Sequence, residues 1–284
     1  ERANRGEFDF RGVTIFMLDE YVGGRDYYRF IHKNLVDKLG AGNRPKAVHV
    51  LNGLASDLKL ETANYEKMIR DAGGVDLAVL GIGVEGHIGF NEAGSFFDLP
   101  AHVVTLAPST IEANPEAKAN GYKQAVTAGI GTILKARSII LIASGLKKAK
   151  VLGEMYSSEP TIAIPATALK FHRNARMIIS GDAATQIKMR AELREEAVNG
   201  VLSVSSVGSV DRAAFSRDIL GMLQSQNMHG NLIVHAAFGE PTRLMQAAQD
   251  AVSGILQDST GGGKAGTSWI VQPNAFGAFQ FFLR

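Results

Sequence analysis

The sequence predicts an α/β fold with a doubly wound, mostly parallel sheet and flanking helices. Short and largely apolar runs recur along the chain, at residues 13–18, 77–80, 138–143 and 175–180. Runs of this length and composition are typical of parallel strands that are buried on both faces. Segments with apolar residues at helical spacing separate the runs, and this alternation predicts strand–helix–strand connections.

The composition is that of an ordinary globular chain, with 284 residues, 45% of them hydrophobic, and a formal net charge of +2. No basic stripe with interleaved aromatic residues occurs, so nucleic acid is not an expected partner. No apolar run approaches the roughly 20 residues of a membrane-spanning helix, so no membrane partner is expected. The absence of cysteine excludes disulfides, thiol catalysis and cysteine metal sites, and it is compatible with the cytoplasm. The sequence opens at Glu1, so it leaves open whether a targeting segment precedes it.

Two acidic residues stand at the end of the first predicted strand. Residues 13–18 read VTIFML, and Asp19 and Glu20 follow directly. In open α/β sheets, ligands bind beyond the carboxyl ends of the strands, so these carboxylates are candidates for a site. The alternative interpretation is a solvated loop. Further along, helices are predicted at residues 27–39 and 58–72, with a short strand at 47–51 between them.

Residues 76–94, DLAVLGIGVEGHIGFNEAG, hold the strongest functional signal of the chain. The strand at 77–80 runs into glycine-rich backbone, which a ligand can approach closely. Glu85, His87 and Glu92 follow within this short stretch. A histidine exchanges protons near neutral pH, and flanking carboxylates can hold its tautomer and stabilise its cation. His87 is therefore a candidate for acid–base chemistry, and the alternative is a structural histidine.

The second half of the chain continues the pattern and adds a lysine-rich turn. A strand is predicted at residues 102–106, followed by an irregular segment at 108–115. A glycine-interrupted helix at 124–136 and a strand at 138–143 come next. The last of these strands ends in Ser144-Gly145, and Lys147 and Lys148 open the next helix. Amides at a helix start, together with a lysine, can bind a phosphate or a carboxylate. The alternative is that both lysines are solvated.

The last part of the chain carries no comparable cluster of acids and histidine. Its predicted helices and strands cover residues 183–198, 211–226, 231–236, 241–257, 269–271 and 276–283. Residues 201–210 are predicted as a linker or an extra strand, and residues 259–267, STGGGKAGT, as a flexible loop. From residue 231 onward the order is therefore strand, helix, glycine-rich loop, strand.

Three motifs together resemble the glucosamine-6-phosphate deaminase and galactosamine-6-phosphate isomerase family, whose superfamily includes the 6-phosphogluconolactonases. GIGVEGHIGFNEAG at 81–94 is similar to the central signature, FMLDEYVGG at 16–24 to the second and SGLKKA at 144–149 to the third. The resemblance covers roughly residues 10–195 and implies a Rossmann-like fold. Lactonases typically carry Thr-Ala-Ser after the Gly-His pair, where this chain has IGFNE at 88–92, and this favours the amino-sugar branch.

The resemblance implies a reaction and a role for the acids and the histidine. Asp19 would take the C2 proton of the sugar, and His87 would catalyse ring opening. Glu85 and Glu92 would orient and charge the imidazole. The product would be a ketose 6-phosphate with release of ammonia, from glucosamine 6-phosphate or an epimer. The resemblance implies no metal and no organic cofactor, and its only implied ligand is the small sugar phosphate.

The resemblance also implies how the substrate is bound, with some departures. Lys148 would contact the phosphate, and Gly83 and Gly86 would bind the substrate. Glu85 stands where the family usually has Asp or Asn. An arginine that holds the phosphate is expected near residues 113–114, where Pro115 and Glu116 follow instead.

A further departure concerns the domains. The family's N-terminal strand–helix–strand, with its Gly- and Thr-rich phosphate loop, is expected before residue 10 and does not occur there. Residues 1–198 are therefore expected to form a deaminase/isomerase-like domain without this unit, and residues 199–284 an extension. We hypothesise that residues 231–284 take the missing place, as in a circular permutation. The alternative is a foreign appendage, and a strand at 232–235 outside the main sheet would exclude the permutation.

Two other functions remain as alternatives at this stage. One is hydrolysis of a sugar-phosphate lactone, as in the 6-phosphogluconolactonases. The other is a catalytically impaired sugar-phosphate binding protein, which the departures at the phosphate would suit. The sequence leaves open the sugar epimer, any allosteric ligand and whether the chain forms a homo-oligomer.

Overall fold

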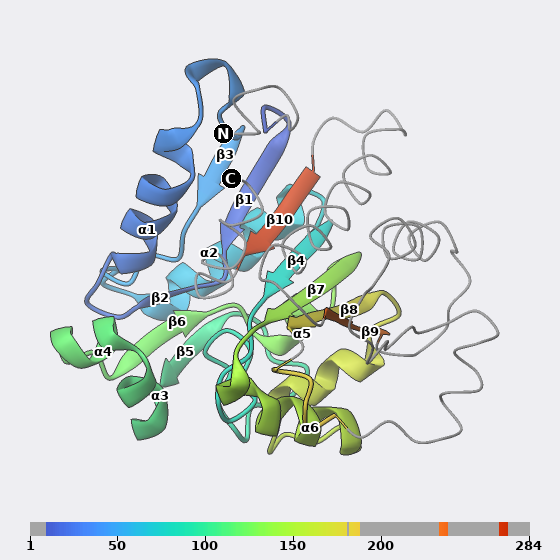
Figure 1. The fold of residues 1–284 in the computed structure, drawn as a ribbon. Coiled ribbons are helices and arrows are strands. Elements are labelled where there is room, and N and C mark those ends of the chain that lie inside the picture. The colour runs from blue at the N-terminus through green and yellow to red at the C-terminus, as the bar shows by residue number, and fades with distance from the viewer. Residues whose placement is uncertain (1–9, 181, 188–232, 238–266, 272–284) are drawn as a thin grey trace.

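The computed structural model describes residues 10–180, 182–187, 233–237 and 267–271. Seven strands, all parallel to their neighbours, form the main sheet (Figure 1). In their order across the sheet they are β3 (Ala47–His49), β1 (Val13–Met17), β10 (Thr267–Val271), β4 (Leu77–Leu80), β7 (Ser138–Ala143), β8 (Ala175–Ser180) and β9 (Ile233–Ala237). The predicted α/β class with a mostly parallel sheet is confirmed.

Strands β1, β4 and β7 of the main sheet are buried on both faces. Successive side chains of a strand point to opposite faces, and each face has its own hydrophobic core. Leu77 and Val79 of β4 belong to one core, whereas Ala78 and Leu80 belong to the other. Because both faces of these strands are covered, their residues are largely apolar, which is why the sequence revealed them.

Helices cover the two faces of the sheet, as a doubly wound fold requires. In the described part of the chain, the α-helices beside the main sheet are α1 (Asp26–Asn34), α2 (Leu58–Asp71), α5 (Ile130–Ile133) and α6 (Ala149–Ser157). Ile31 of α1 joins the first core, while Ile69 of α2 and Leu152 of α6 join the second. Short 3-10 helices lie at Val36–Lys38, Ala41–Asn43, Leu146–Lys148 and Pro165–Phe171.

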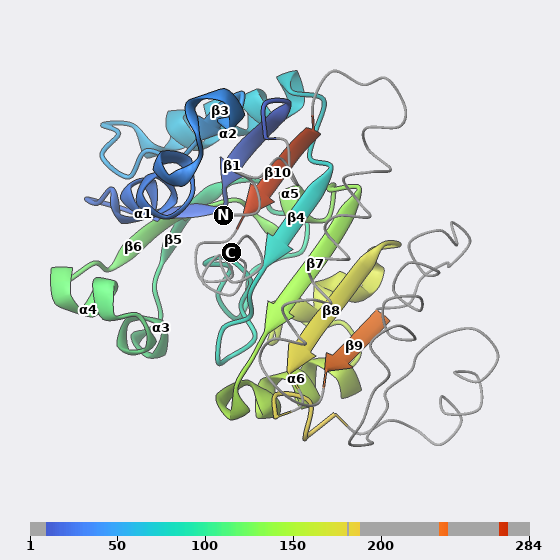
Figure 2. The same cartoon turned by 45° about the horizontal axis from the view of Figure 1, so that its top comes forward.

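A small antiparallel sheet, which the sequence did not predict, adjoins the main one. Its strands, in order, are β2 (Asp19–Tyr21), β6 (Gln124–Thr127) and β5 (His102–Thr105). Two short helices, α3 (Pro108–Ala113) and α4 (Pro115–Asn120), connect β5 to β6. Figure 2 shows this sheet beyond the arrowheads of β1 and β4, with α3 and α4 at its outer end. The small sheet therefore lies at the edge where a ligand is expected.

Some sequence predictions are wrong, and the small sheet explains why. The predicted helix at 124–136 is instead β6 followed by the short helix α5, because Ala125 and Val126 are buried between β2 and β5. The solvated-loop interpretation of Asp19 and Glu20 is also wrong, since both residues are buried. The segment at 108–115, predicted as irregular, contains α3 and the start of α4, and each helix begins at a proline.

Both described strands of the last part of the chain join the main sheet. β9 pairs with β8 at the edge, and β10 lies between β1 and β4. The result that would have excluded the permutation is thus not observed, and the permutation stays a prediction. The predicted helix at 183–198 is not helical in its described part, since residues 183–186 form turns, and its remainder lies outside the described residues. The other elements predicted after it, and the linker and loop between them, also lie outside the described residues. Within the described residues, none of the helices has both the length and the apolar character needed to cross a bilayer.

Candidate active site

Three chain segments that follow strands of the main sheet carry the candidate residues. β1 leads through Leu18 into Asp19, β4 leads into the loop of His87, and β7 leads into the turn with Lys148. Because the three strands are parallel members of one sheet, their carboxyl ends lie along the same edge. The site can therefore be built from three short segments that are distant in the sequence.

Backbone hydrogen bonds and two glycines hold the His87 loop in place. The N–H of Gly83 donates to the carbonyl of His87 at 2.8 Å, and the carbonyl of Gly86 accepts the N–H of Ala166 at 2.8 Å. A Cβ atom on Gly83 would overlap the imidazole of His87. Gly86 has φ +83°, a conformation that favours glycine, and a Cβ there would press on Ile164. The glycines thus leave room for a closely packed imidazole.

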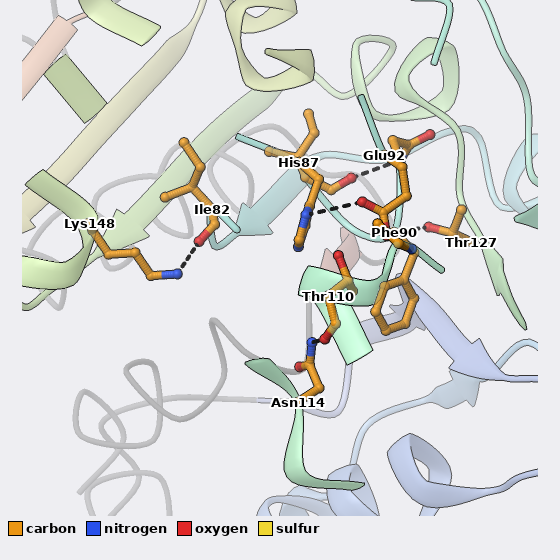
Figure 3. Close-up of polar contacts among 11 residues, drawn as sticks. Ile82, His87, Phe90, Glu92, Thr110, Asn114, Thr127 and Lys148 are labelled. Carbon is orange, nitrogen blue, oxygen red and sulfur yellow. Dashed lines mark hydrogen bonds and ion pairs between the residues drawn. The ribbon is translucent and has the colours of Figure 1, made fainter. Parts of the chain in front are cut away.

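His87 and Glu92 face one another in the buried part of this loop (Figure 3). His87 Nδ1 lies 3.5 Å from Glu92 Oε2, and the other carboxylate oxygen, Oε1, accepts the N–H of Ala107 at 3.0 Å. Burial lowers the pKa of His87 from its ordinary value of 6.5, and the charge of Lys148 acts in the same direction. The charge of Glu92 opposes this, and so does that of Glu85. The imidazole is thus favoured in its neutral form, which can accept a proton.

Glu85 differs from Glu92 in its surroundings. Its side chain is exposed in the turn between Gly83 and His87, whereas only 12% of the side chain of Glu92 is exposed. Glu85 therefore acts on the imidazole through its charge, while Glu92 also meets the ring nitrogen.

Asp19 is a buried carboxylate whose Oδ1 atom has no hydrogen-bond partner among the described residues. Burial, and next the charge of Glu20, raise the pKa of Asp19 well above its ordinary value of 3.8. Asp19 pairs with Thr127 in the small sheet, and the hydroxyl of Thr127 accepts the N–H of Phe90 at 3.2 Å. Thr127 thus links the strand of Asp19 to the loop of His87 (Figure 3).

Glu20, the neighbour of Asp19, has a structural role. Its carboxylate accepts the backbone N–H groups of Tyr21, Asp26, Tyr27 and Tyr28 at 2.9–3.3 Å. The last three of these groups belong to the start of α1, where N–H groups have no partner inside the helix. The two adjacent acids are therefore distinct, because Glu20 is fully bonded and Asp19 is not.

Lys148 reaches back to the strand end from the turn after β7. Its Nζ atom donates to the carbonyl oxygen of Ile82 at 2.7 Å (Figure 3), and burial lowers its pKa. Lys147 is exposed, so the solvated interpretation holds for Lys147 and not for Lys148. A lysine held at the carboxyl end of β4 can meet an anionic group of a ligand at this edge.

Two further polar side chains near these residues were not predicted as site residues. Asn91 donates to the carbonyls of Ile88 and Ala128, and its buried Oδ1 atom has no partner in the described part of the chain. The buried hydroxyl of Thr110 on α3 is also without a partner there. Asn91 lies within the motif at residues 81–94, so that motif could have indicated it. Thr110 lies in a segment without any sequence signal, so only its place in the structure reveals it.

Comparisons with known proteins point to one family. Residues 1–179 match the model of a family described as glucosamine-6-phosphate isomerases/6-phosphogluconolactonase. A glucosamine-6-phosphate deaminase of Thermoanaerobacter sp. (strain X514) is 40% identical over 195 residues, which are 66% of this chain and 76% of that protein. One of Clostridium perfringens (strain 13 / Type A) is 41% identical over 193 residues, or 65% and 79% of the two chains. The solved structure of a monomeric glucosamine-6-phosphate deaminase is similar with a TM-score of 0.59 and 31% identity, over 65% of this chain and 79% of that chain.

Proposed function

The chain belongs to the family of glucosamine-6-phosphate isomerases and 6-phosphogluconolactonases, and on this basis we propose that it is an aminosugar-phosphate deaminase. It converts glucosamine 6-phosphate, or an epimer, and water to a ketose 6-phosphate and ammonia. The observation that carries this proposal is the buried pair of His87 and Glu92, 3.5 Å apart, on a sheet edge shared with Asp19, whose buried Oδ1 atom has no hydrogen-bond partner among the described residues.

Ring opening is the first step, and it needs one proton taken and one returned. Neutral His87 takes the proton of the O1 hydroxyl while the bond between C1 and the ring oxygen breaks, and it returns a proton to that oxygen. The lowered pKa of His87 supports this role because it leaves the imidazole neutral near pH 7. Glu92 stabilises the imidazolium that forms for a moment.

Proton transfer between C2 and C1 is the second step, and it needs a carboxylate base that stays in place. Asp19 takes the C2 proton from the open-chain sugar and returns a proton to C1, while one proton of the amino group passes to O1, so that the C1 aldehyde becomes a hydroxymethyl group and the C2–N bond becomes an imine. Water then adds to C2, ammonia leaves, and a ketone remains there. The raised pKa of Asp19 supports this role, because a carboxylate is a stronger base when its pKa is higher.

Lys148 binds the phosphate in this proposal. Its ammonium group lies beside Ile82 at the end of β4, between the His87 loop and the turn after β7. Gly83 and Gly86 supply backbone without side chains, so a sugar can approach it closely. No arginine stands near residues 113–114, so Lys148 carries more of the phosphate binding than it would with an arginine beside it.

The test is an assay of ammonia release from glucosamine 6-phosphate, with His87→Ala as the variant. General acid–base catalysis is usually worth about 10²–10⁴-fold in rate, so we expect a loss of that size. His32→Ala, on the outer part of α1, is the control and should keep the rate of the parent protein.

Three results would contradict parts of the proposal. A loss below about threefold in His87→Ala would remove His87 from the mechanism. Consumption of a sugar-phosphate lactone without ammonia release from glucosamine 6-phosphate would favour the lactonase. Thermal stabilisation by the sugar phosphate without any turnover would indicate an impaired binding protein.

A further inference from the structure

Thr110 on α3 carries a buried hydroxyl group. The residue is 1% exposed, and its Oγ1 atom has no hydrogen-bond partner among the described residues. A buried hydroxyl normally finds a partner, because leaving it unbonded costs the desolvation free energy of the group. An unsatisfied buried group in a native structure therefore requires an explanation.

The position of Thr110 connects it to the pair of His87 and Glu92. Ala107, immediately before α3, donates its N–H to Glu92 Oε1 at 3.0 Å. Thr110 lies three residues later, in the first turn of α3, and residues three apart share one face of a helix. Figure 3 shows the side chain of Thr110 directed toward the side of the site where His87 and Glu92 lie.

One ring nitrogen of His87 also lacks a hydrogen bond among the described residues. Its Nδ1 atom is buried and accepts or donates no hydrogen bond in the described structure. The contact of 3.5 Å with Glu92 Oε2 is an ion-pair distance, and it exceeds the usual length of an N–H···O hydrogen bond. A hydroxyl group can accept one hydrogen bond and donate another, so a hydroxyl that lies beside this pair can bond to both the ring nitrogen and the carboxylate.

We propose that Thr110 is a positioning residue, whose hydroxyl accepts the Nδ1–H of His87 and donates to the Glu92 carboxylate when substrate is bound. This inference rests on the proposed deaminase function. The bridge fixes the proton on Nδ1 and leaves Nε2 as the nitrogen that exchanges protons with the sugar. Catalytic hydrogen bonds are often long in a substrate-free enzyme and shorten in the complex, which accounts for the absence of these bonds among the described residues.

The bridge has a defined electrostatic consequence. A hydroxyl that accepts a proton from the imidazolium stabilises the charged form and so raises the pKa of His87. It acts in the same direction as the charges of Glu92 and Glu85 and against burial and the charge of Lys148. Removing the hydroxyl should therefore lower the pKa of His87, while a threonine with only a packing role would leave it unchanged.

The experiment compares Thr110→Val, which keeps the shape and loses the hydroxyl, with Thr110→Ser, which keeps the hydroxyl. Thr62→Val is the control, because Thr62 is also a buried helical threonine but donates to Lys59 O, away from the site. The pKa of His87 is measured by NMR with and without the sugar phosphate, and its signal is assigned from a His87→Gln spectrum. Ammonia release gives kcat and KM, and thermal unfolding gives Tm.

We expect Thr110→Val to lower the pKa of His87 in the complex by about half a unit to one unit, the worth of one hydrogen bond. Its kcat should fall about tenfold with KM nearly unchanged, because the hydroxyl acts on His87 and not on the sugar. Its Tm should not fall, since the unbonded hydroxyl contributes nothing to the stability of the free protein. Thr110→Ser should restore kcat and the pKa, and Thr62→Val should leave both unchanged.

An unchanged pKa of His87 in Thr110→Val would overturn the inference, whether or not the protein releases ammonia. Equal losses in Thr110→Ser and Thr110→Val would also overturn it, because the hydroxyl would then not be the cause. A parent protein that binds the sugar phosphate without releasing ammonia would refute the proposed function alone. The pKa of His87 in that complex would still decide the role of Thr110.

Discussion

At the scale of single residues, the adjacent carboxylates of Asp19 and Glu20 differ in their hydrogen bonding. Glu20 accepts four backbone N–H groups and ties the start of α1 to the small sheet. Asp19 is equally buried, yet its Oδ1 atom has no partner in the described structure. A buried carboxylate with an oxygen that accepts no hydrogen bond is costly for folding, and buried ionisable groups with shifted pKa values are concentrated at functional sites. Glu20 thus serves the stability of the fold, whereas the surroundings of Asp19 suit the catalytic role proposed for it.

Asp19→Asn should abolish most of the activity and increase stability at neutral pH. Burial raises the pKa of Asp19, so the folded protein holds this proton more tightly than the unfolded chain does. The contribution of Asp19 to stability therefore falls as the pH rises from its ordinary pKa of 3.8 toward the raised one, and it stays low above that. Asparagine does not titrate and avoids this loss.

We expect the Tm of Asp19→Asn at pH 7 to be about 2–4 °C higher, the change that about 1 kcal/mol produces in a chain of this size. Thermal unfolding between pH 3 and pH 8 checks the sign, since the difference from the parent protein should disappear toward the acid end. A lower Tm at pH 7 would show that the ionised carboxylate stabilises the fold.

At the scale of elements, the loop after β4 determines where the imidazole lies. The loop is held by the bond from Gly83 N–H to the His87 carbonyl and by the bond from Ala166 N–H to the Gly86 carbonyl. Glu92, at the end of the same loop, binds the N–H of Ala107 next to α3. The loop thus joins the main sheet to the helices beside the small sheet, and its glycines provide the space that the ring occupies.

Gly83→Ala tests this arrangement, because a Cβ at this position would overlap the imidazole of His87. The ring must move, and a misplaced catalytic group can cost about 10²-fold in rate, so kcat should fall by that order. Gly42→Ala is the matched control, since a Cβ there meets nothing within 4 Å. A kcat within twofold of the parent protein in Gly83→Ala would show that the ring is free to shift without loss.

At the scale of the whole molecule, the main sheet is made from segments that are far apart in the sequence. β10 lies between β1 and β4, and β9 extends the sheet beyond β8. The strands that lead to Asp19 and to His87 are thus separated by a strand from near the end of the chain. This position suits the proposal that the segment from residue 231 completes the domain as in a circular permutation.

Removal of residues 199–284 should therefore prevent cooperative folding. The truncated chain would leave β1 and β4 without the strand between them and would expose apolar faces of the core, so we expect no cooperative thermal transition. Co-expression of residues 199–284 as a separate chain should restore it. A truncated chain with the Tm and activity of the whole protein would instead identify these residues as an appendage.

Much of the fold could be predicted because its signals are local. Strands buried on both faces are apolar throughout, and so β1, β4, β7 and β8 stand out in the sequence. β6 was missed because its residues, QAVT, are not distinctive and its burial comes from pairing with β2 and β5. Pairing between distant segments overrides local propensity, which is why the antiparallel sheet could not be predicted.

For the site, the sequence by itself determined the chemical groups, because a motif records which side chains follow a strand end. Asp19, Glu85, His87, Glu92 and Lys148 were predicted as site residues in this way. Only the tertiary structure decided which of these side chains are buried and which of their atoms have hydrogen-bond partners, because both depend on residues far along the chain. It made Glu20 a helix cap, and it placed Thr110, which no motif marks, in the helix beside Glu92.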